Sequence, residues 1–347
     1  MKRILHILPS NRFSGAENVV CQIINMFREK EQQYEMIYAS PDGPIRDALQ
    51  ERNVDFMPLE SMRIKSVRRA IKQTKPDIIH VHDMKASFFV SLACGRIPII
   101  SHIHNNNFDV QKPTLKAILY CVASIKAKRI VWVSESALNG YCFNRICRHK
   151  STVLYNVVDA KELERKAAKS ECKSVYDIVY IGRLTYQKNP QRLINILSKV
   201  IAEEPQIKVA IIGSGELQGD TCAAIVAKGM ENNISYLGYM SNPYGILKNA
   251  KMMIMTSRWE GTPMCALEAL ALGVPIVSTP TDGLCEIIVP EVTGYLNADD
   301  DGIVRACIRL ANDPVLQRKM SNESLLRAND ILDIDLYRNV LRSIYES

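Results

Sequence analysis

Short aliphatic runs alternate with segments of helical periodicity along almost the whole chain, and this alternation occurs twice. In the first half we expect strands at residues 3–8, 35–39, 54–59, 77–81, 98–102, 129–133 and 152–154. Apolar residues recur at helical spacing between them, for example at residues 16–27, 66–75 and 114–126. Continuous aliphatic strands that alternate with helices are typical of a parallel sheet covered on both faces.

The pattern weakens at residues 159–174, which are rich in Lys, Glu and Ala, and then restarts. Further strands are expected at residues 176–181, 208–212, 234–237, 252–255 and 275–278. The sequence therefore predicts an α/β protein with two doubly wound, Rossmann-like domains, which suits a chain of 347 residues. The expected bounds are 1–158 for the first domain, 159–174 for a linker, 175–330 for the second domain and 331–347 for a C-terminal helix.

Composition excludes several other classes of protein. The chain is 47% hydrophobic and 23% charged, which is close to a globular average. No apolar run reaches the roughly 18 residues of a membrane span, and the first apolar stretch is interrupted by His6. The ten cysteines form no Cys-x-x-Cys pair, so we expect neither a zinc site nor a disulfide framework. These features predict a cytoplasmic protein.

Charge is distributed unevenly between the two halves. Residues 1–158 hold 23 Lys and Arg against 13 Asp and Glu, whereas residues 159–347 hold 21 against 24, which gives net charges of +10 and −3. A basic half indicates an anionic partner, such as a phospholipid surface, a lipid phosphate or a nucleic acid. A solvated basic face without a partner is the alternative interpretation.

The first candidate for chemistry is the segment from Gly182 to Pro190, which follows an expected strand and begins an expected helix. Pro190 suits the first helical position and Asn189 suits the N-cap. Arg183 and Lys188 would then lie beside a helix N-terminus, where two cations and free N–H groups favour a diphosphate. A surface loop with two solvated cations is the alternative.

The second candidate is the segment from Glu260 to Glu268, which follows the expected strand at residues 252–255. Thr262 can cap a helix and Pro263 can start it. The free N–H groups of that helix would belong to Met264, Cys265 and Ala266. Carboxylates beside such a site accept hydrogen bonds from sugar hydroxyls, although a cap and a solvated helix glutamate would give the same pattern.

Two further features follow strands of the first half. Gly15 lies between the first strand and the first helix, where glycine allows close approach of a ligand, but no Gly-x-Gly-x-x-Gly for a nicotinamide dinucleotide is present. The motifs His80-Val81-His82 and His102-Ile103-His104 each place two imidazoles on one face of a strand. They can orient a sugar or move a proton. We expect no metal there, because Asp83 is the one carboxylate nearby.

In this order and spacing the motifs resemble those of retaining GT-B glycosyltransferases of family 4, the glycosyl transferases group 1, of the bacterial surface-polysaccharide type. The pattern Gly182-Arg183-x4-Lys188 precedes Glu260-x7-Glu268. Further matching positions are Ser14 to Glu17, His104-Asn105, Val133 to Ser136, Asn156 with Asp159, Gly213 to Glu216, Gly238, Asp282-Gly283 with Glu286, and Gly294-Tyr295. The resemblance covers nearly the whole chain and implies two Rossmann-like domains that face each other across a cleft, with a C-terminal helix that crosses back to the first domain.

The resemblance also implies a role for each matching residue. Arg183 and Lys188 would bind the donor diphosphate and stabilise the leaving nucleotide, and Glu268 would hold the ribose hydroxyls. Glu260 would hold hydroxyls of the donor sugar, and His104 would lie near that sugar. The other donor-binding positions would be Gly15 at the diphosphate, Gly238, Tyr239 and Met240 at the base, and Gly261, Thr262, Met264 and Cys265 at the sugar.

The implied mechanism retains the anomeric configuration and needs no metal or cofactor, because two cations and helix N-termini can take up phosphate charge. The donor would be a nucleotide sugar, UDP-linked by family frequency, and the acceptor a glycan or lipid-linked glycan. An anionic face of the inner membrane would attract two basic clusters, whereas no nucleic acid is expected. These clusters are Arg63, Lys65, Arg68, Arg69 and Lys72, and Lys112, Lys116, Lys126, Lys128 and Arg129.

Three departures and two alternatives qualify the resemblance. Ser14 and Val157 stand where the family commonly has glycine, and residues 283–286 replace a more glycine-rich run. Such changes can alter the preference for acceptor or sugar. Another GT-B enzyme, either a nucleotide-sugar epimerase or a phosphorylase with a pyridoxal-phosphate lysine, would share the fold. A non-enzymatic binding protein for an anionic ligand would suit the basic half.

Overall fold

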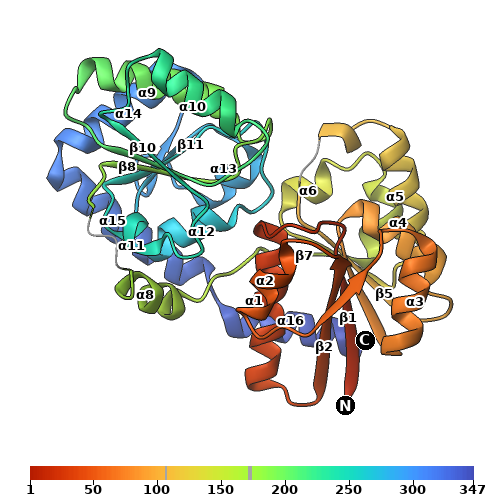
Figure 1. Ribbon diagram of the computed structural model, residues 1–347. Coiled ribbons are helices and arrows are strands. Elements are labelled where there is room, and N and C mark those ends of the chain that lie inside the picture. Colours follow the sequence, from red (N-terminus) through yellow and green to blue (C-terminus); the bar gives the residue numbers. More distant parts are fainter. Residues whose placement is uncertain (106–107, 171–173) are drawn as a thin grey trace. The chain divides into compact units, whose positions relative to one another are not determined.

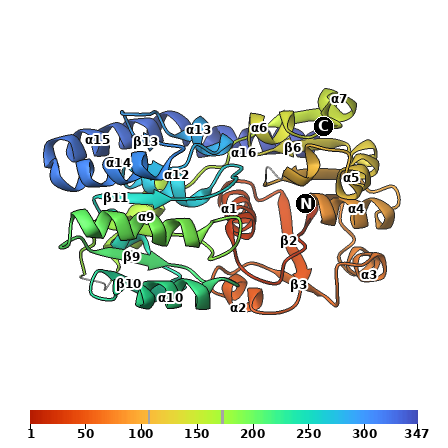
Figure 2. The same cartoon turned by 90° about the horizontal axis from the view of Figure 1, so that it is seen from above.

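The computed structural model describes residues 1–105, 108–170 and 174–347 (Figure 1). The chain forms two compact units. Unit 1 comprises Met1–Asn156 together with Ile334–Ser347, and unit 2 comprises Val157–Asp333. Each unit is a parallel sheet with helices on both faces (Figures 1 and 2), which confirms the expected α/β class with two doubly wound sheets. Among the described residues, no helix is both long and apolar enough to cross a membrane.

The sheet of unit 1 has seven parallel strands in the order β3-β2-β1-β4-β5-β6-β7. All seven strands expected from the sequence are present, with ends displaced by no more than two residues. The strands are β1 Lys2–Ile7, β2 Tyr34–Pro41, β3 Phe56–Leu59, β4 Ile78–His82, β5 Ile99–Ile103, β6 Arg129–Trp132 and β7 Ser151–Val153.

The two faces of this sheet differ in chemistry. On one face, Leu5 and Ile79 join an aliphatic cluster with Val67 and Val90, which are contributed by α3 and α4. The opposite face carries histidines of three neighbouring strands. The helices and 3-10 turns of unit 1 are α1 Gly15–Lys30, α2 Ile45–Gln50, α3 Ile64–Thr74, α4 Met84–Ala93, η1 Phe108–Val110, α5 Leu115–Lys126, α6 Glu135–Asn139, α7 Asn144–Cys147, η2 Arg148–Lys150 and α16 Ile334–Glu346.

Helix α16 packs on unit 1, although it is the last segment of the chain. The ring of Tyr345 lies edge-on to Phe27 of α1, with centroids 5.4 Å apart. The Nζ of Lys2 donates to the Tyr345 carbonyl at 2.8 Å, and Arg342 forms an ion pair with Glu31 at 2.9 Å. These contacts explain why residues 334–347 belong to the same compact unit as the N-terminus.

The sheet of unit 2 has six parallel strands in the order β10-β9-β8-β11-β12-β13. Five of them were expected, but the edge strand β13 was not, because its three residues begin with Gly294 and form no aliphatic run. The strands are β8 Ile178–Ile181, β9 Val209–Ile212, β10 Ile234–Gly238, β11 Met252–Met255, β12 Ile276–Ser278 and β13 Gly294–Leu296.

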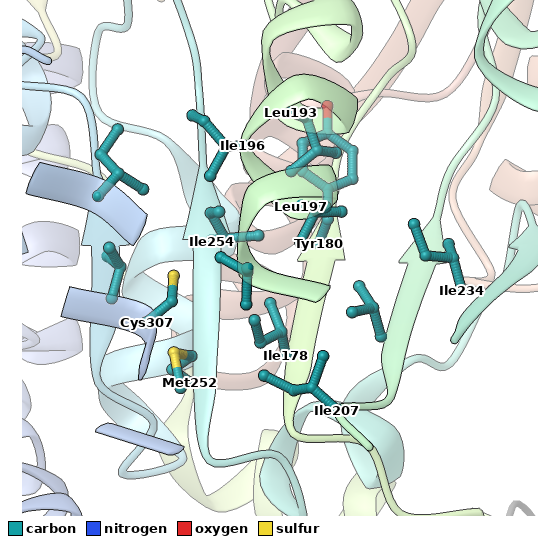
Figure 3. Close-up of a cluster of buried hydrophobic side chains, with 14 of the residues drawn as sticks. Ile178, Tyr180, Leu193, Ile196, Leu197, Ile207, Ile234, Met252, Ile254 and Cys307 are labelled. Carbon is teal, nitrogen blue, oxygen red and sulfur yellow. The ribbon is translucent and has the colours of Figure 1, made fainter. Parts of the chain in front are cut away.

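Helices cover both faces of this second sheet, and one face forms a large aliphatic core. Figure 3 shows Leu193 and Leu197 of α9 packed beside Tyr180 of β8, and all three side chains are buried. The helices of unit 2 are α8 Ala160–Ala168, α9 Pro190–Glu203, α10 Gln218–Ala227, α11 Tyr244–Lys248, α12 Met264–Ala271, α13 Asp282–Ile287, α14 Asp300–Asn312 and α15 Pro314–Ile331.

The expected linker at residues 159–174 is largely a helix of unit 2. Asp159 caps α8 by accepting from the backbone N–H of Glu162 at 3.0 Å, and α8 packs on α11 and α12. Leu163 and Ala167 are the buried residues of that helix. Residues 160–168 of the expected linker are therefore an amphipathic helix, while Cys172 and the rest of residues 171–173 lie outside the described residues.

Candidate functional site

The strand order of unit 2 brings two loops of the predicted site together. The first strand of the unit, β8, lies beside β11, at the point where the order of the strands reverses. Ligands of open α/β sheets bind at the carboxyl ends of strands beside such a switch point. Arg183 and Lys188 follow β8, and Glu260 follows β11, so these three predicted residues share one edge of the sheet.

Lys188 and Glu260 form a buried ion pair at this edge. The Lys188 Nζ lies 2.5 Å from Oε1 of Glu260, and the two side chains are only 12% and 5% exposed. Ser257 donates from its Oγ to the same Oε1 at 2.6 Å. Burial disfavours the charged ammonium, but the Glu260 carboxylate outweighs this effect and raises the pKa of Lys188. Lys188 is therefore a fixed cation at neutral pH.

The loops after β8 and β11 are also hydrogen-bonded to each other. The N–H of Arg258 donates to the Gln187 carbonyl at 2.8 Å, and the Gln187 side-chain amide donates to the Trp259 carbonyl at 3.0 Å. The Thr256 hydroxyl donates to the Lys188 carbonyl at 3.1 Å. The loops after β8 and β11 therefore form one assembly, which sets the position of the ion pair.

Arg183 is the exposed cation of the pair predicted for a diphosphate. Its guanidinium donates to Oε1 of Gln187 at 3.3 Å and lies close enough to Lys188 to oppose the charge there. The loop beneath it is tightly packed, because a Cβ on Gly213 would lie 1.9 Å from the Gly182 carbonyl oxygen. A Cβ on Gly215 would lie 2.3 Å from the Leu184 carbonyl oxygen. Arg183 thus projects from a rigid loop into solvent.

Helix α12 begins at Met264, one residue later than expected. Pro263 has an extended backbone, with φ −70° and ψ 121°, and occupies the N-cap in place of Thr262. The prediction that Thr262 caps the helix is therefore wrong, because the extended Pro263 moves the start along the chain. The first-turn N–H groups of Met264 and Cys265 still lack intrahelical acceptors, as in any helix.

Cys265 lies in the first turn of α12. Burial, the largest effect, raises the pKa of its thiol to about 12; Glu260 and Glu268 also raise this pKa, and Lys188 lowers it. The thiol is therefore neutral at neutral pH.

Glu268 lies within α12 and is buried. Its Oε1 accepts from the Tyr244 hydroxyl at 3.1 Å. Burial raises the pKa of Glu268 to about 7, although the hydrogen bond from Tyr244 and the positive charge of Lys166 both act in the opposite direction. A carboxyl group with this pKa changes its charge near neutral pH and gains from any ligand that donates hydrogen bonds to it.

The loop after β10 is the candidate for the base. Gly238 has φ +68°, a backbone conformation that glycine adopts readily, and its carbonyl accepts from the N–H of Gly213 at 2.7 Å. Tyr239 is 57% exposed, and Met240 is half-buried beside it. An exposed aromatic ring at the carboxyl end of a strand is available for stacking.

In unit 1, Gly15 is the first residue of α1 and is exposed. Ser14 occupies the N-cap, but its hydroxyl donates to Oε2 of Glu17 and does not cap the helix through its side chain. The backbone N–H of Gly15 therefore lies in the first turn, where helices have free donors. The structure places Gly15 where the sequence predicted it, after β1.

The histidines of unit 1 form a connected chain on one face of its sheet. The His104 Nε2 lies 2.8 Å from Nδ1 of His82, and the His82 Nε2 lies 3.0 Å from Nδ1 of His6. His80 bonds through Nδ1 to the Tyr345 hydroxyl at 2.7 Å. Burial lowers the pKa of His6 and of His104 to about 3, so both rings are neutral.

In neutral imidazoles one ring nitrogen donates and the other accepts, so each bond in this chain fixes a tautomer. If His104 accepts at Nε2, then its Nδ1 carries the proton, and the reverse arrangement moves a proton at all three rings. Among the described residues, Nδ1 of His104 has no hydrogen-bond partner. The same holds for Nε2 of His6, Nε2 of His80 and both ring nitrogens of His102, and all of these atoms are buried.

The same rings are also the best candidates for metal ligands. Nitrogens of His6, His80 and His82, and of His82, His102 and His104, lie within 4.8 Å of one another. Imidazole is a common ligand for zinc and copper. However, neither group includes a carboxylate among the described residues, and Asp83 caps α4 by accepting from the Met84 N–H at 2.5 Å. The prediction that no metal binds here stays a prediction.

Sequence reasoning missed four residues of these sites. His6 joins the chain because β1 pairs with β4 in a register that places it opposite His80. Tyr244, Ser257 and Tyr345 each contact a predicted residue through one hydroxyl. The even spacing of the histidines along their strands was a signal for a shared face, but strand order and register were needed to bring in His6.

Comparison with known proteins agrees with this geometry. Residues 13–162 match the family described as Glycosyltransferase Family 4, and residues 161–326 match the family described as Glycosyl transferases group 1. An uncharacterized glycosyltransferase of Methanocaldococcus jannaschii is 27% identical over 252 residues, which cover 66% of this chain but only 62% of that protein.

Two further similarities extend over most of the chain. The UDP-Gal:alpha-D-GlcNAc-diphosphoundecaprenol alpha-1,3-galactosyltransferase of Escherichia coli is 23% identical over 364 residues, covering 92% of this chain and 90% of that protein. HepE of Anabaena, solved in complex with UDP-glucose, has a TM-score of 0.84 at 17% identity, with full coverage of both chains. The two sheets thus define the GT-B class. The chain belongs to the group 1 family of glycosyltransferases, with an N-terminal part of family 4.

Proposed function

We propose that this protein is a retaining glycosyltransferase that moves a sugar from a UDP-linked donor to a glycan or lipid-linked glycan in surface polysaccharide synthesis. The observation that carries the proposal is the Lys188–Glu260 ion pair beside the N-terminus of α12, at the switch point of the sheet. It is supported by the E. coli relative, whose name gives a UDP-galactose donor and a diphosphoundecaprenol-linked acceptor, and by the UDP-glucose bound to HepE.

In this proposal the donor diphosphate lies against Arg183 and Lys188. Both are cations at neutral pH, and the loop that carries them is fixed by Gly213 and Gly215. As the bond between sugar and phosphate breaks, negative charge grows on the phosphate oxygens, and these two cations stabilise it. The residues therefore supply what a divalent ion supplies elsewhere, which is the reason to propose metal-independent transfer without a cofactor.

The carboxylates bind the neutral parts of the donor. Glu260 accepts from Lys188 and Ser257 at one oxygen, Oε1, which leaves Oε2 available for a sugar hydroxyl. Glu268 accepts from the ribose hydroxyls.

The remaining donor contacts come from backbone groups and from the base-binding loop. Near the sugar, backbone groups are offered by Gly261, Thr262, Met264 and Cys265. Tyr239 stacks on the base between Gly238 and Met240. In unit 1, the proposed ligand-binding groups are the backbone N–H of Gly15 and the ring of His104.

Calorimetry with UDP, UDP-glucose, UDP-galactose and their N-acetylated forms tests donor binding, with GDP-mannose as a control. We expect one UDP-linked sugar to bind and to be transferred or slowly hydrolysed in the presence of EDTA, with a product of the same anomeric configuration by NMR. Loss of activity in EDTA, or inversion of the anomer, would contradict the mechanism. Conversion of the donor sugar without any acceptor would instead indicate an epimerase.

We further propose that the protein acts at the inner face of an anionic membrane, since a lipid-linked acceptor would lie there. The exposed Lys and Arg of α3 support this, because Lys65, Arg68, Arg69 and Lys72 all lie on its outer face. We do not expect nucleic acid as a partner. Binding to anionic vesicles that disappears at high salt is the expected result.

A further inference from the structure

The outer face of α5 is apolar, which is unusual for a helix at the surface of a protein. Leu115, Ile118, Val122 and Ile125 are 72%, 46%, 49% and 63% exposed. Their spacing of three and four residues places them in one line along the helix. We call these four residues the α5 stripe. Single exposed hydrophobic side chains are common, but a continuous row of them marks an interaction surface.

The stripe is not the side of α5 that holds the helix to its unit. The opposite side carries Ala117, Tyr120 and Ala123, which are buried in a cluster with Trp132. Thr114 caps the helix by accepting from the Ala117 N–H, and α4 packs along it (Figure 1). Helix α5 is therefore apolar on both sides, whereas α3 of the same unit exposes basic side chains.

Basic residues outnumber acidic ones in the part of the chain that contains the stripe. Residues 109–158 hold eight Lys and Arg against two acidic residues, Asp109 and Glu135. The Nζ of Lys150 donates to the carbonyls of Ile125 and Ala127 at 2.8 and 2.9 Å, which places an ammonium group at the C-terminal end of the stripe. The basic residues of this region are Lys112, Lys116, Lys126, Lys128, Arg129, Arg145, Arg148 and Lys150.

We propose that α5 docks unit 1 on an anionic lipid membrane, with the α5 stripe in the interface and the Lys and Arg of this region against the lipid headgroups. This proposal rests on the proposed function, in which the acceptor is lipid-linked. It identifies α5 as the helix that binds the enzyme to the membrane. Apolar side chains on a helix gain from burial at the boundary between headgroups and acyl chains, and nearby cations add attraction to anionic lipids. A second protein copy would need a self-complementary surface, and this region repels itself by charge.

The test uses the full chain and vesicles of phosphatidylcholine, with or without phosphatidylglycerol. The stripe variant, Leu115→Gln/Ile118→Gln/Ile125→Gln, makes three of the four stripe residues polar without changing charge. The matched control is Val226→Gln/Val315→Gln/Leu326→Gln in unit 2, whose side chains are 61%, 73% and 57% exposed. We expect wild type and control to sediment with phosphatidylglycerol vesicles, and the stripe variant to bind about tenfold or more weakly.

Two further variants separate the contribution of the basic side chains to vesicle binding from the insertion of the stripe into the membrane. Lys112→Gln/Lys116→Gln/Lys126→Gln retains the stripe, and each lost lysine should weaken binding to anionic vesicles about fivefold, with a shallower dependence on salt. In the variant Val122→Trp, the new indole should shift its emission to the blue when phosphatidylglycerol vesicles are added, beyond any shift of the wild-type protein. This reporter keeps the proposal testable if the triple variant folds poorly.

Equal binding of wild type and stripe variant to phosphatidylglycerol vesicles, or an indole emission that does not shift in the Val122→Trp protein, overturns the proposal. A dimer in sedimentation velocity that the stripe variant converts to a monomer would assign the face to a second copy and also overturns it. Calorimetry with UDP separates this from the proposed function. Failure of docking alone leaves UDP binding intact, whereas failure of the donor site abolishes UDP binding and leaves the vesicle result unchanged.

Discussion

Lys188 Nζ and Glu260 Oε1 lie 2.5 Å apart, although 72 residues separate them in the chain. The pairing of β8 with β11 brings their loops together, and the Ser257 hydroxyl donates to the same carboxylate oxygen. A cation that is already held at a helix N-terminus loses little freedom when a diphosphate arrives. The pair is therefore a preformed part of the proposed donor site.

Replacing Lys188 by Met tests how much the free energy of unfolding falls when the buried Glu260 loses its cation. A buried carboxylate without its cation is strongly unfavourable, so the free energy of unfolding should fall by about 3 kcal/mol or more. Donor affinity should fall as well, because the phosphate loses a cation. Urea denaturation and calorimetry measure the two effects.

The matched control is Lys199→Met, which breaks the exposed ion pair of Lys199 with Asp301, whose side chains are 51% and 68% exposed. Exposed pairs contribute little to stability. We expect little change in unfolding and none in donor affinity. Equal destabilisation by both variants would contradict the special role of the buried pair.

Glu268 should make stability depend on pH. Its pKa is about 7 in the folded protein, against an ordinary value of 4.5, so the folded state takes up a proton that the unfolded state has lost. The resulting stability is fully present below pH 4.5 and is lost as the pH rises through 7. Glu268→Gln cannot ionise, so its melting temperature should exceed that of wild type more at pH 8 than at pH 5.

Donor affinity should show the opposite trend in the same pair of proteins. Ribose hydroxyls donate to a carboxylate more strongly than to a neutral acid, so the affinity of wild type for the UDP-sugar should fall as the pH drops below about 7. The diphosphate of a UDP-sugar is esterified at both ends and does not titrate in this range, so in Glu268→Gln the affinity should be lower and independent of pH between 5 and 8. A wild-type affinity that stays flat across this range would rule out a ribose contact by the ionised Glu268.

His82 should fix the tautomer of His104. In His82→Phe, the Nε2 of His104 and the Nδ1 of His6 lose their partners, which should cost about 1–3 kcal/mol of stability. The ¹⁵N shifts of the His104 ring should then report a changed tautomer, and turnover should fall more than donor affinity. Tyr345→Phe is the control, because it breaks the bond to His80 and leaves the chain from His82 to His104 intact.

Gly283→Ala should displace the loop that holds Glu260. A Cβ at Gly283 would lie 1.3 Å from the Gly261 carbonyl oxygen, so the backbone must move. We expect at least a tenfold loss of UDP-sugar affinity by calorimetry, about 1.4 kcal/mol. Gly219→Ala, whose Cβ would meet no atom within 4 Å, should bind the donor as wild type does. Unchanged affinity in Gly283→Ala would show that the loop adapts.

Much of the fold followed from the sequence because its signals are local. Buried parallel strands are aliphatic runs, and caps mark the starts of helices, as Thr114 does by accepting from Ala117 in the structure. The start of α12 was displaced by one residue because Pro263 is extended, which the sequence leaves open. Strand β13 was missed because three residues beginning with glycine have no periodicity to detect.

The sequence by itself determined the class of the fold and which cations and carboxylates follow which strands, since both depend on neighbours along the chain. Tertiary structure alone decided that Lys188 pairs with Glu260, that Tyr244 bonds to Glu268, and that His6 joins His82. Those contacts depend on strand order and register. The periodicity of apolar residues likewise does not predict the stripe on α5. A helix that is apolar on two sides has the sequence pattern of a buried helix, and only the structure shows that one side is exposed.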